Sequence, residues 1–237
     1  MSALQLPLAS FSGAIEFIFT PQSSNVTGGK EVGGFEQVLE LTLKQLEVTA
    51  LAMALALVIA LPLGLYLGHR GRGEQLLVGL ANAGRAVPEL ALIALVAALI
   101  GVGLVPVTIA LAVLGVPPIL TNAYVGVRQV DQASVDAARG MGMSELEIIR
   151  KVELPLAIPT IMGGVRGATI AIVATATIAP LAGVVTLGDF IINASIYGED
   201  GRLAGAILVA VLALALEGLL ALLQRRLTSD GLKLKTV

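Results

Sequence analysis

Long blocks of alanine, leucine, valine and isoleucine, separated by short charged loops, constrain this chain more than any other feature of its sequence. Of its 237 residues, 56% are hydrophobic and only 14% are charged, whereas soluble domains carry roughly 25% charged residues. A water-soluble helix needs polar residues at helical spacing on its outer face. Because the apolar blocks lack such residues, their outer faces must meet lipid. We therefore expect an all-α integral membrane protein.

Five apolar runs reach or approach the length of about 20 residues that crosses a bilayer. They are Val48–Leu67, Leu90–Val102, Val105–Tyr124, Pro159–Ala179 and Leu203–Leu223. We expect the second run to extend backwards through Val87 and Pro88 as one helix. The segment between Pro180 and Gly201 is expected to form a short helix and loops at the membrane face. The sequence therefore predicts about five transmembrane helices.

The distribution of basic residues predicts the orientation of these spans. One side of the membrane would receive Arg70, Arg72, Arg128, Arg139, Arg150, Lys151, Arg225, Arg226, Lys233 and Lys235, and the other only Lys30, Lys44 and Arg202. The positive-inside rule places the larger set in the cytoplasm, with the N-terminus outside and the C-terminus inside. We expect an external segment over 1–43, a transmembrane domain over 44–227 and a cytoplasmic tail over 228–237. Within the external segment, residues 21–34 have the composition of a flexible linker.

Several kinds of chemistry find no support in the sequence. There are no cysteines and one histidine, so neither a thiolate site nor a histidine-based metal site is expected. His69 is interpreted as a solvated loop residue. The net charge of −2 argues against a nucleic-acid partner. No Gly-x-x-x-x-Gly-Lys-Ser/Thr sequence is present, so no nucleotide-binding loop of that type is encoded.

The central loop over 128–155 has the signals of two short helices joined by a sharp turn. Ser134 is a candidate N-cap of the first helix, and Gly140 and Gly142 can end it in a left-handed conformation. Ser144 and Glu147 have capping-box spacing and predict the start of the second helix. We expect Pro155 to break that helix before the next span. The small Ala137 and Ala138 would let another protein approach the first helix closely.

This loop resembles the EAA loop of the permease subunits of ABC importers. The family pattern is Glu-Ala-Ala, three residues, Gly, nine residues, Ile, one residue and Leu-Pro. Here Asp136, Ala137 and Ala138 begin the pattern, Gly142 has the required spacing, Val152 replaces Ile, and Leu154 and Pro155 complete it. The two departures, Asp for Glu and Val for Ile, are conservative.

The resemblance implies a type I importer permease that is not itself an enzyme. ATP and Mg²⁺ would be bound by an ATPase dimer, with a second permease chain, identical or paralogous, and an external substrate-binding protein as further partners. The residues implied in coupling to the ATPase are Asp136, Ala137, Ala138, Arg139, Gly142, Leu154 and Pro155.

Further segments resemble the osmoprotectant branch, which imports glycine betaine, choline, carnitine or proline betaine. They include Gly84–Pro88, Pro117–Leu120, Glu153–Pro159 and Leu187–Phe190. A permease for methionine or another small amino acid stays open as an alternative. A secondary transporter driven by an ion gradient is the alternative from another class, although the sequence shows no internal repeat.

Four ionisable residues lie in or beside the apolar runs, where a charge costs roughly 2.5–3.5 kcal/mol on insertion scales. Arg85 and Glu89 are four residues apart and can form a structural pair, or they can line a pathway or gate. Arg166 and Glu217 are either interhelical partners or residues at helix ends. All four are candidate pathway residues.

Overall fold

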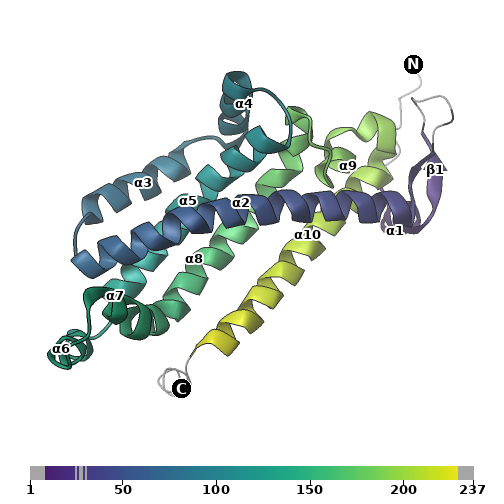
Figure 1. The fold of residues 1–237 in the computed structure, drawn as a ribbon. Coiled ribbons are helices and arrows are strands. Elements are labelled where there is room, and N and C mark those ends of the chain that lie inside the picture. Colours follow the sequence, from purple (N-terminus) through teal and green to yellow (C-terminus); the bar gives the residue numbers. More distant parts are fainter. Residues whose placement is uncertain (1–8, 25, 27–28, 30, 229–237) are drawn as a thin grey trace.

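The computed structural model describes residues 9–24, 26, 29 and 31–228, without the side chains of Leu76, Leu80, Ala83 and Arg85. Helices dominate this part of the chain, and the long ones form an elongated bundle (Figure 1). The elements are α1 (Phe11–Phe19), β1 (Pro21–Ser23), β2 (Glu31–Gly33), α2 (Gly34–Arg70), α3 (Glu74–Ala86), α4 (Glu89–Ile100), α5 (Leu104–Arg128), α6 (Gln132–Gly140), α7 (Glu145–Ile148), the π-helical η1 (Ile149–Glu153), α8 (Leu154–Thr175), the 3₁₀-helical η2 (Ala176–Ala182), α9 (Gly188–Ile192) and α10 (Ala194–Leu227).

Among the described residues, four helical segments are long and apolar enough to cross a membrane. They are Gly34–Arg70, Leu104–Arg128, Glu145–Ala182 and Ala194–Leu227. The second apolar run was predicted to form one long helix, but in the structure it forms two shorter helices, α3 and α4. The chain breaks at Val87 and Pro88, and Pro88 has an extended ψ of 126° as the N-cap of α4. A proline disfavours helical geometry in the residue before it, which explains the break.

A stripe of small residues joins α2 to α5. Ala52, Ala56, Ala60, Gly64 and Gly68 recur every four residues on α2, and all five are buried. A Cβ atom added at Gly64 would lie 2.5 Å from the Cβ of Ala123 and 2.8 Å from the carbonyl oxygen of Leu120. The two backbones therefore approach as closely as only small residues allow.

On its other face α5 packs against α8, again through glycine. An added Cβ at Gly164 would lie 2.7 Å from the carbonyl oxygen of Pro118, and one at Gly126 would lie 3.1 Å from that of Ala157. The three helices α2, α5 and α8 form the centre of the bundle. Helix α10 lies beside α8, to which hydrogen bonds of Glu217 and Gln224 join it, and within the described residues its most apolar stretch contains no buried position.

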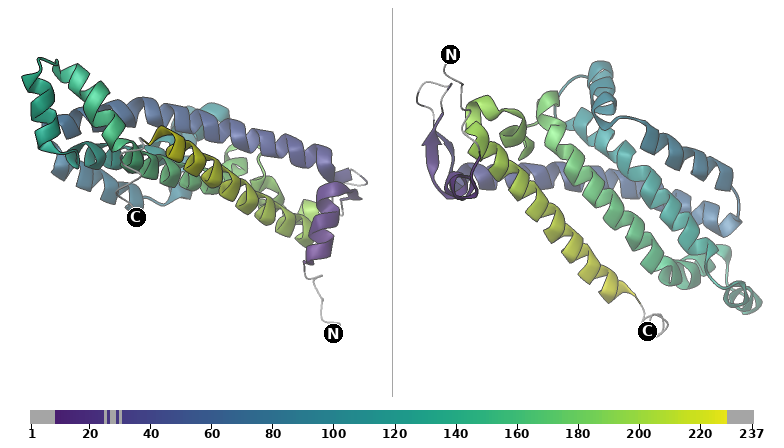
Figure 2. Two further views of the ribbon diagram at one scale, coloured as in Figure 1. Left: turned by 90° about the horizontal axis from the view of Figure 1, so that it is seen from below. Right: turned by 180° about the vertical axis from the view of Figure 1, so that it is seen from behind.

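The segment before α2 has more structure than the sequence indicated. Strands β1 and β2 pair antiparallel, with Pro21 opposite Gly33, so residues 21–34 do not form a linker throughout. Helix α1 lies across the end of the bundle (Figure 2). Its Phe17 makes edge contacts with Phe190 at 5.2 Å and Tyr197 at 6.3 Å between ring centroids. These aromatic contacts fix the N-terminal segment on α9 and the start of α10.

We expect Gly64→Ala to destabilise the protein, because the added methyl group would overlap the backbone of α5. Overpacking of this kind costs about 1–3 kcal/mol. Thermal unfolding of the purified protein in detergent measures the effect. The control is Gly79→Ala on α3, where no described atom lies within 4 Å of the added group. Equal unfolding temperatures for the two variants would contradict the close α2–α5 contact.

Candidate functional site

The loop between α5 and α8 folds as two helices joined by a turn, as the sequence predicted. Helix α6 begins at Gln132, and its N-cap is Asp131, whose carboxylate accepts a hydrogen bond from the backbone N–H of Ala133. The prediction of Ser134 as the N-cap was therefore wrong. Aspartate and serine are both good caps, and the sequence offers both within a few residues. As a result Asp136 lies beyond the first turn of α6.

Gly142 makes the turn that ends α6. Its φ of +85° lies in the left-handed region, which only glycine adopts easily. The N–H of Gly142 bonds to the carbonyl of Arg139 at 3.0 Å, and the N–H of Met143 bonds to that of Ala138 at 3.2 Å. This pair of bonds is a Schellman motif. Gly140 remains within the helix, so Gly142 alone of the two candidates takes the left-handed conformation.

Helix α7 begins with the predicted capping box. The hydroxyl of Ser144 accepts from the N–H of Glu147, and the Glu147 carboxylate accepts from the N–H of Ser144 at 3.1 Å. The predicted break at Pro155 was wrong, because α7, η1 and α8 form one continuous helical segment. The π-turn at 149–153 shifts the hydrogen-bond pattern just before Pro155, whose nitrogen donates no bond.

This unit of α6, α7 and η1, which we call the coupling unit (residues 130–153), has a small apolar core of its own. The core consists of the buried Val130, Val135, Ala138 and Ile148. Ala138 therefore packs inwards, and of the two alanines only Ala137 is exposed. Met141 at the turn is 72% exposed. The surface available to another protein thus comprises Asp136, Ala137, Met141 and their exposed neighbours.

Ion pairs fasten α6 to α7. Two guanidinium nitrogens of Arg139, Nε and Nη2, each donate to the Glu145 carboxylate at 3.1 Å. The third, Nη1, donates to Asp136 at 3.2 Å. The neighbouring Glu145 raises the pKa of Arg139. The angle between α6 and α7 is thus held by the glycine turn, the shared core and this bidentate pair.

His69 is not a solvated loop residue, contrary to the sequence interpretation. It lies in the last turn of α2, and its side chain is only 7% exposed. Its Nδ1 atom lies 2.8 Å from Oε2 of Glu153, and its Nε2 atom lies 2.8 Å from Oε2 of Glu145. Sequence reasoning missed this contact because its two partners are far along the chain from His69.

The four candidate pathway residues of the apolar helices have different surroundings in the structure. Arg166 on α8 donates to Glu217 on α10 and, at 2.8 Å, to Gln224 on the same helix, so Arg166 and Glu217 are interhelical partners. Glu89 accepts a hydrogen bond of 2.6 Å from the hydroxyl of Thr175. The side chain of Arg85 lies outside the described residues, so its pairing with Glu89 stays a prediction.

Two grooves flank α8. One of about 1160 Å³ lies beside Gln129, Asp131, Pro159, Arg166 and Gln224, next to the coupling unit. The other, of about 670 Å³, is lined by Glu89, Pro117, Thr121, Asn122 and Gly167. It lies where α3 and α4 meet, against α5 and α8. Glu89 is thus a carboxylate beside a hollow within the apolar part of the molecule.

Comparison with known proteins agrees with this architecture. The family described as binding-protein-dependent transport system inner membrane component matches residues 60–229. The chain is 36% identical to the choline transport system permease protein OpuBB of Bacillus subtilis over 83% of this chain and 91% of that protein. It is 36% identical to the carnitine transport permease protein OpuCB of Listeria monocytogenes over 83% and 90%.

Solved structures show the same fold. A chain of the MetNI methionine ABC transporter is similar with a TM-score of 0.71 at 20% identity, covering 82% of this chain and 98% of that one. A chain of an amino acid ABC transporter is similar with a TM-score of 0.60 at 20% identity, covering 81% and 94%.

We expect Gly142→Val to loosen the turn of the coupling unit. A non-glycine residue in the left-handed conformation costs roughly 1–2 kcal/mol, more when it is β-branched. Amide hydrogen exchange should therefore speed up at residues 142 and 143. The matched control is Gly140→Ala, two residues away at a helical position with no described atom within 4 Å of the added group. Equal exchange rates at residues 142 and 143 in the two variants would show that valine does not strain the turn.

Proposed function

The chain belongs to the family of binding-protein-dependent transport system inner membrane components, and from this premise we propose that it is the permease subunit of an ATP-driven importer of quaternary ammonium osmoprotectants. The observation that carries the proposal is the similarity, over 83% of the chain, to permeases named for choline and carnitine. The folded coupling unit supports it, because such a unit suits a membrane protein driven from outside its own chain.

ATP hydrolysis, in this proposal, takes place on a partner ATPase that binds ATP and Mg²⁺. The sequence has no Gly-x-x-x-x-Gly-Lys-Ser/Thr loop of its own. The exposed face of α6, with Asp136, Ala137 and Arg139, would dock on the ATPase. Leu154 and Pro155 then connect the coupling unit directly to α8, since the helical segment continues through them. A push on α6 would therefore act on α8 without an intervening flexible loop.

The importer would also contain a second permease chain and an external binding protein. The open side of α10, with no buried residue in its apolar stretch among the described residues, leaves room for a partner in the membrane. High-affinity recognition would belong to the binding protein. Quaternary ammonium groups are usually held by aromatic cages, and this chain has no tryptophan and only three tyrosines.

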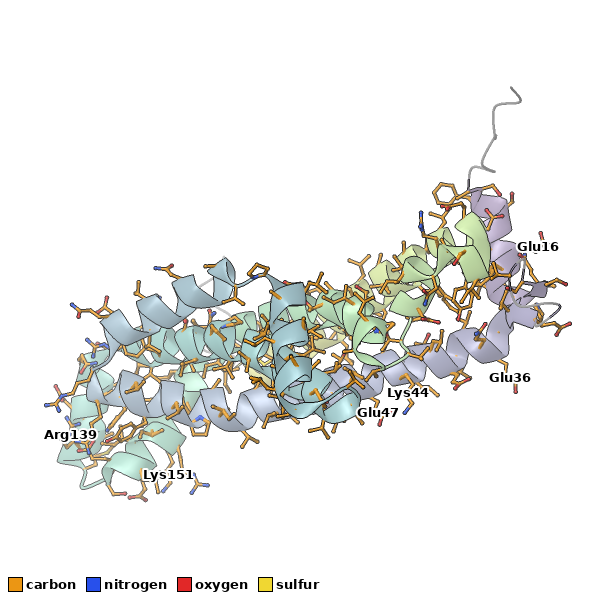
Figure 3. The ribbon with its side chains drawn as sticks, turned by 90° about the horizontal axis from the view of Figure 1, so that it is seen from above. Glu16, Glu36, Lys44, Glu47, Arg139 and Lys151 are labelled. Carbon is orange, nitrogen blue, oxygen red and sulfur yellow. The ribbon has the colours of Figure 1, made fainter. Side chains whose placement is uncertain are left out.

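We place the coupling unit and the C-terminus in the cytoplasm. Arg139 and Lys151 lie at one end of the molecule, whereas Glu16 and Glu36 lie at the other (Figure 3). The positive-inside rule assigns the first end to the cytoplasm. Helix α10 runs from the α1 end towards the end that carries α6 (Figure 1), so the C-terminus would be cytoplasmic. Helix α1 lies at the opposite end, so the N-terminal segment would be outside.

The pathway would follow the groove beside Glu89. The carboxylate of Glu89 would attract the quaternary ammonium group of a passing substrate. The hydrogen bond from Thr175 holds this carboxylate in place. Arg85 would lie at the same break between α3 and α4. Arg166 and Glu217 have a different role in this proposal, because they neutralise one another between α8 and α10. They would fasten α10 beside the pathway.

Uptake of labelled choline and glycine betaine tests the proposal. The chain is expressed with its ATPase and binding protein in a host that lacks osmoprotectant importers. We expect uptake that is abolished when the ATPase is inactivated. ATPase-dependent uptake of methionine alone would keep the architecture and overturn the substrate class. Uptake that is unaffected by the loss of the ATPase would overturn the coupling mechanism.

Glu89→Gln should lower choline uptake more than glycine betaine uptake. Choline carries a net positive charge and glycine betaine carries none, so only choline gains a net attraction from the carboxylate. An attraction of about 1 kcal/mol, as for unit charges 4 Å apart in water, corresponds to about fivefold. Glutamine still accepts the hydrogen bond from Thr175. The control is Glu47→Gln, an exposed carboxylate paired with Lys44. Equal losses for both substrates would show that Glu89 is structural.

A further inference from the structure

His69 connects the end of one span to the coupling unit through both of its ring nitrogens. Nδ1 lies 2.9 Å and 2.8 Å from the two carboxylate oxygens of Glu153, and Nε2 lies 2.8 Å from Glu145. Glu153 belongs to η1 and Glu145 to α7. The side chains of His69 and Glu153 are only 7% and 5% exposed. These are hydrogen-bond distances, and the contact is largely shielded from water.

Two carboxylates around one imidazole need two donors. An ionised carboxylate only accepts, and a neutral imidazole donates from one nitrogen while the other presents a lone pair. The protonated ring donates from both nitrogens. With it, the connected cluster has two cations, His69 and Arg139, and each of its three carboxylates, Asp136, Glu145 and Glu153, contacts at least one of them. Loss of the ring proton would leave the buried Glu153 without a cationic partner, which is costly in a poorly hydrated site.

Among the described side chains, His69 is the cation that lies within 4 Å of the Glu153 carboxylate. Lys151, on the same element as Glu153, pairs with Glu147. Arg139 of α6 contacts the other side of Glu145. Arg70 of α2 lies over the ring of Tyr66, 5.6 Å from its centre. From α5, the guanidinium of Arg128 lies beside Gly71, because a Cβ added there would lie 3.1 Å from it.

We propose that His69, protonated on both ring nitrogens, is a positioning residue that fastens the coupling unit to the cytoplasmic end of α2. The chain itself joins this unit only to α5 and α8. The His69 contacts add a third attachment, at a helix that packs tightly on α5 through the adjacent Gly68. Movement of α6 and α7 is thereby transmitted to α2, α5 and α8 together. Coupling of ATP hydrolysis to import then depends on the ring proton.

The inference rests on the proposed function, and the test is read against wild-type uptake measured in the same vesicles. His69→Gln keeps a donor and an acceptor but cannot carry the positive charge. We expect substrate imported per ATP hydrolysed to fall by about 2- to 30-fold. We also expect the wild-type ratio to decline at a pH high enough to remove the ring proton, and the ratio of the variant to stay flat, because glutamine has no such proton to lose.

The matched control is Arg70→Gln, which removes a neighbouring positive charge that faces Tyr66 instead of the two carboxylates. It should keep the wild-type ratio and its pH profile. A His69→Gln protein with the wild-type ratio and profile would overturn the proposal. Failure of wild-type uptake itself would instead overturn the proposed function.

Nitrogen NMR of the wild-type protein gives a second test that needs no variant to fold. The chain has one histidine, so its imidazole signals are unambiguous. We expect hydrogens on both ring nitrogens at the pH of full coupling. A neutral ring at that pH would overturn the proposal, whatever the transport rates.

Discussion

The close contact between α2 and α5 is the interaction on which the rest of this structure depends. In lipid, apolar side chains gain little from leaving one apolar environment for another, so helices associate through close packing of their backbones. The alanine and glycine stripe that ends in Gly64 and Gly68 allows this approach. Because α8 packs on the opposite face of α5 through Gly126 and Gly164, one central helix sets the positions of its two neighbours.

That packing also determines where the C-terminal end of α2 lies. Gly68 contacts α5, and the next residue, His69, meets the coupling unit at Glu145 and Glu153. The coupling unit has its own apolar core and its own ion pairs, so its helices are held to one another. The chain joins this unit to α5 and α8, and His69 joins it to α2, so a local element is attached to all three central helices.

The charges inside the apolar helices follow from the same environment. An isolated charge facing lipid is costly, and Arg166, Glu217 and Glu89 each have a polar partner. Arg166 of α8 meets Glu217 and Gln224 of α10, which holds the two helices together. Glu89 accepts from Thr175 beside a hollow of about 670 Å³. The first arrangement joins two helices, whereas the second leaves a carboxylate beside open space.

The sequence by itself determined the features that depend on nearby residues: the helical membrane architecture, the left-handed turn at Gly142 and the capping box at Ser144 and Glu147. These could be predicted because hydropathy, glycine conformation and capping act over a few residues. Tertiary structure alone decided the partners of His69, the pairing of Arg166 with Glu217, the inward packing of Ala138 and the docking of α1 on α9. Apart from the packing of Ala138, which depends on how α6 and α7 fold onto one another, each of these contacts joins segments that are far apart in the chain. Their geometry follows from how closely the helix backbones approach, which no local pattern encodes.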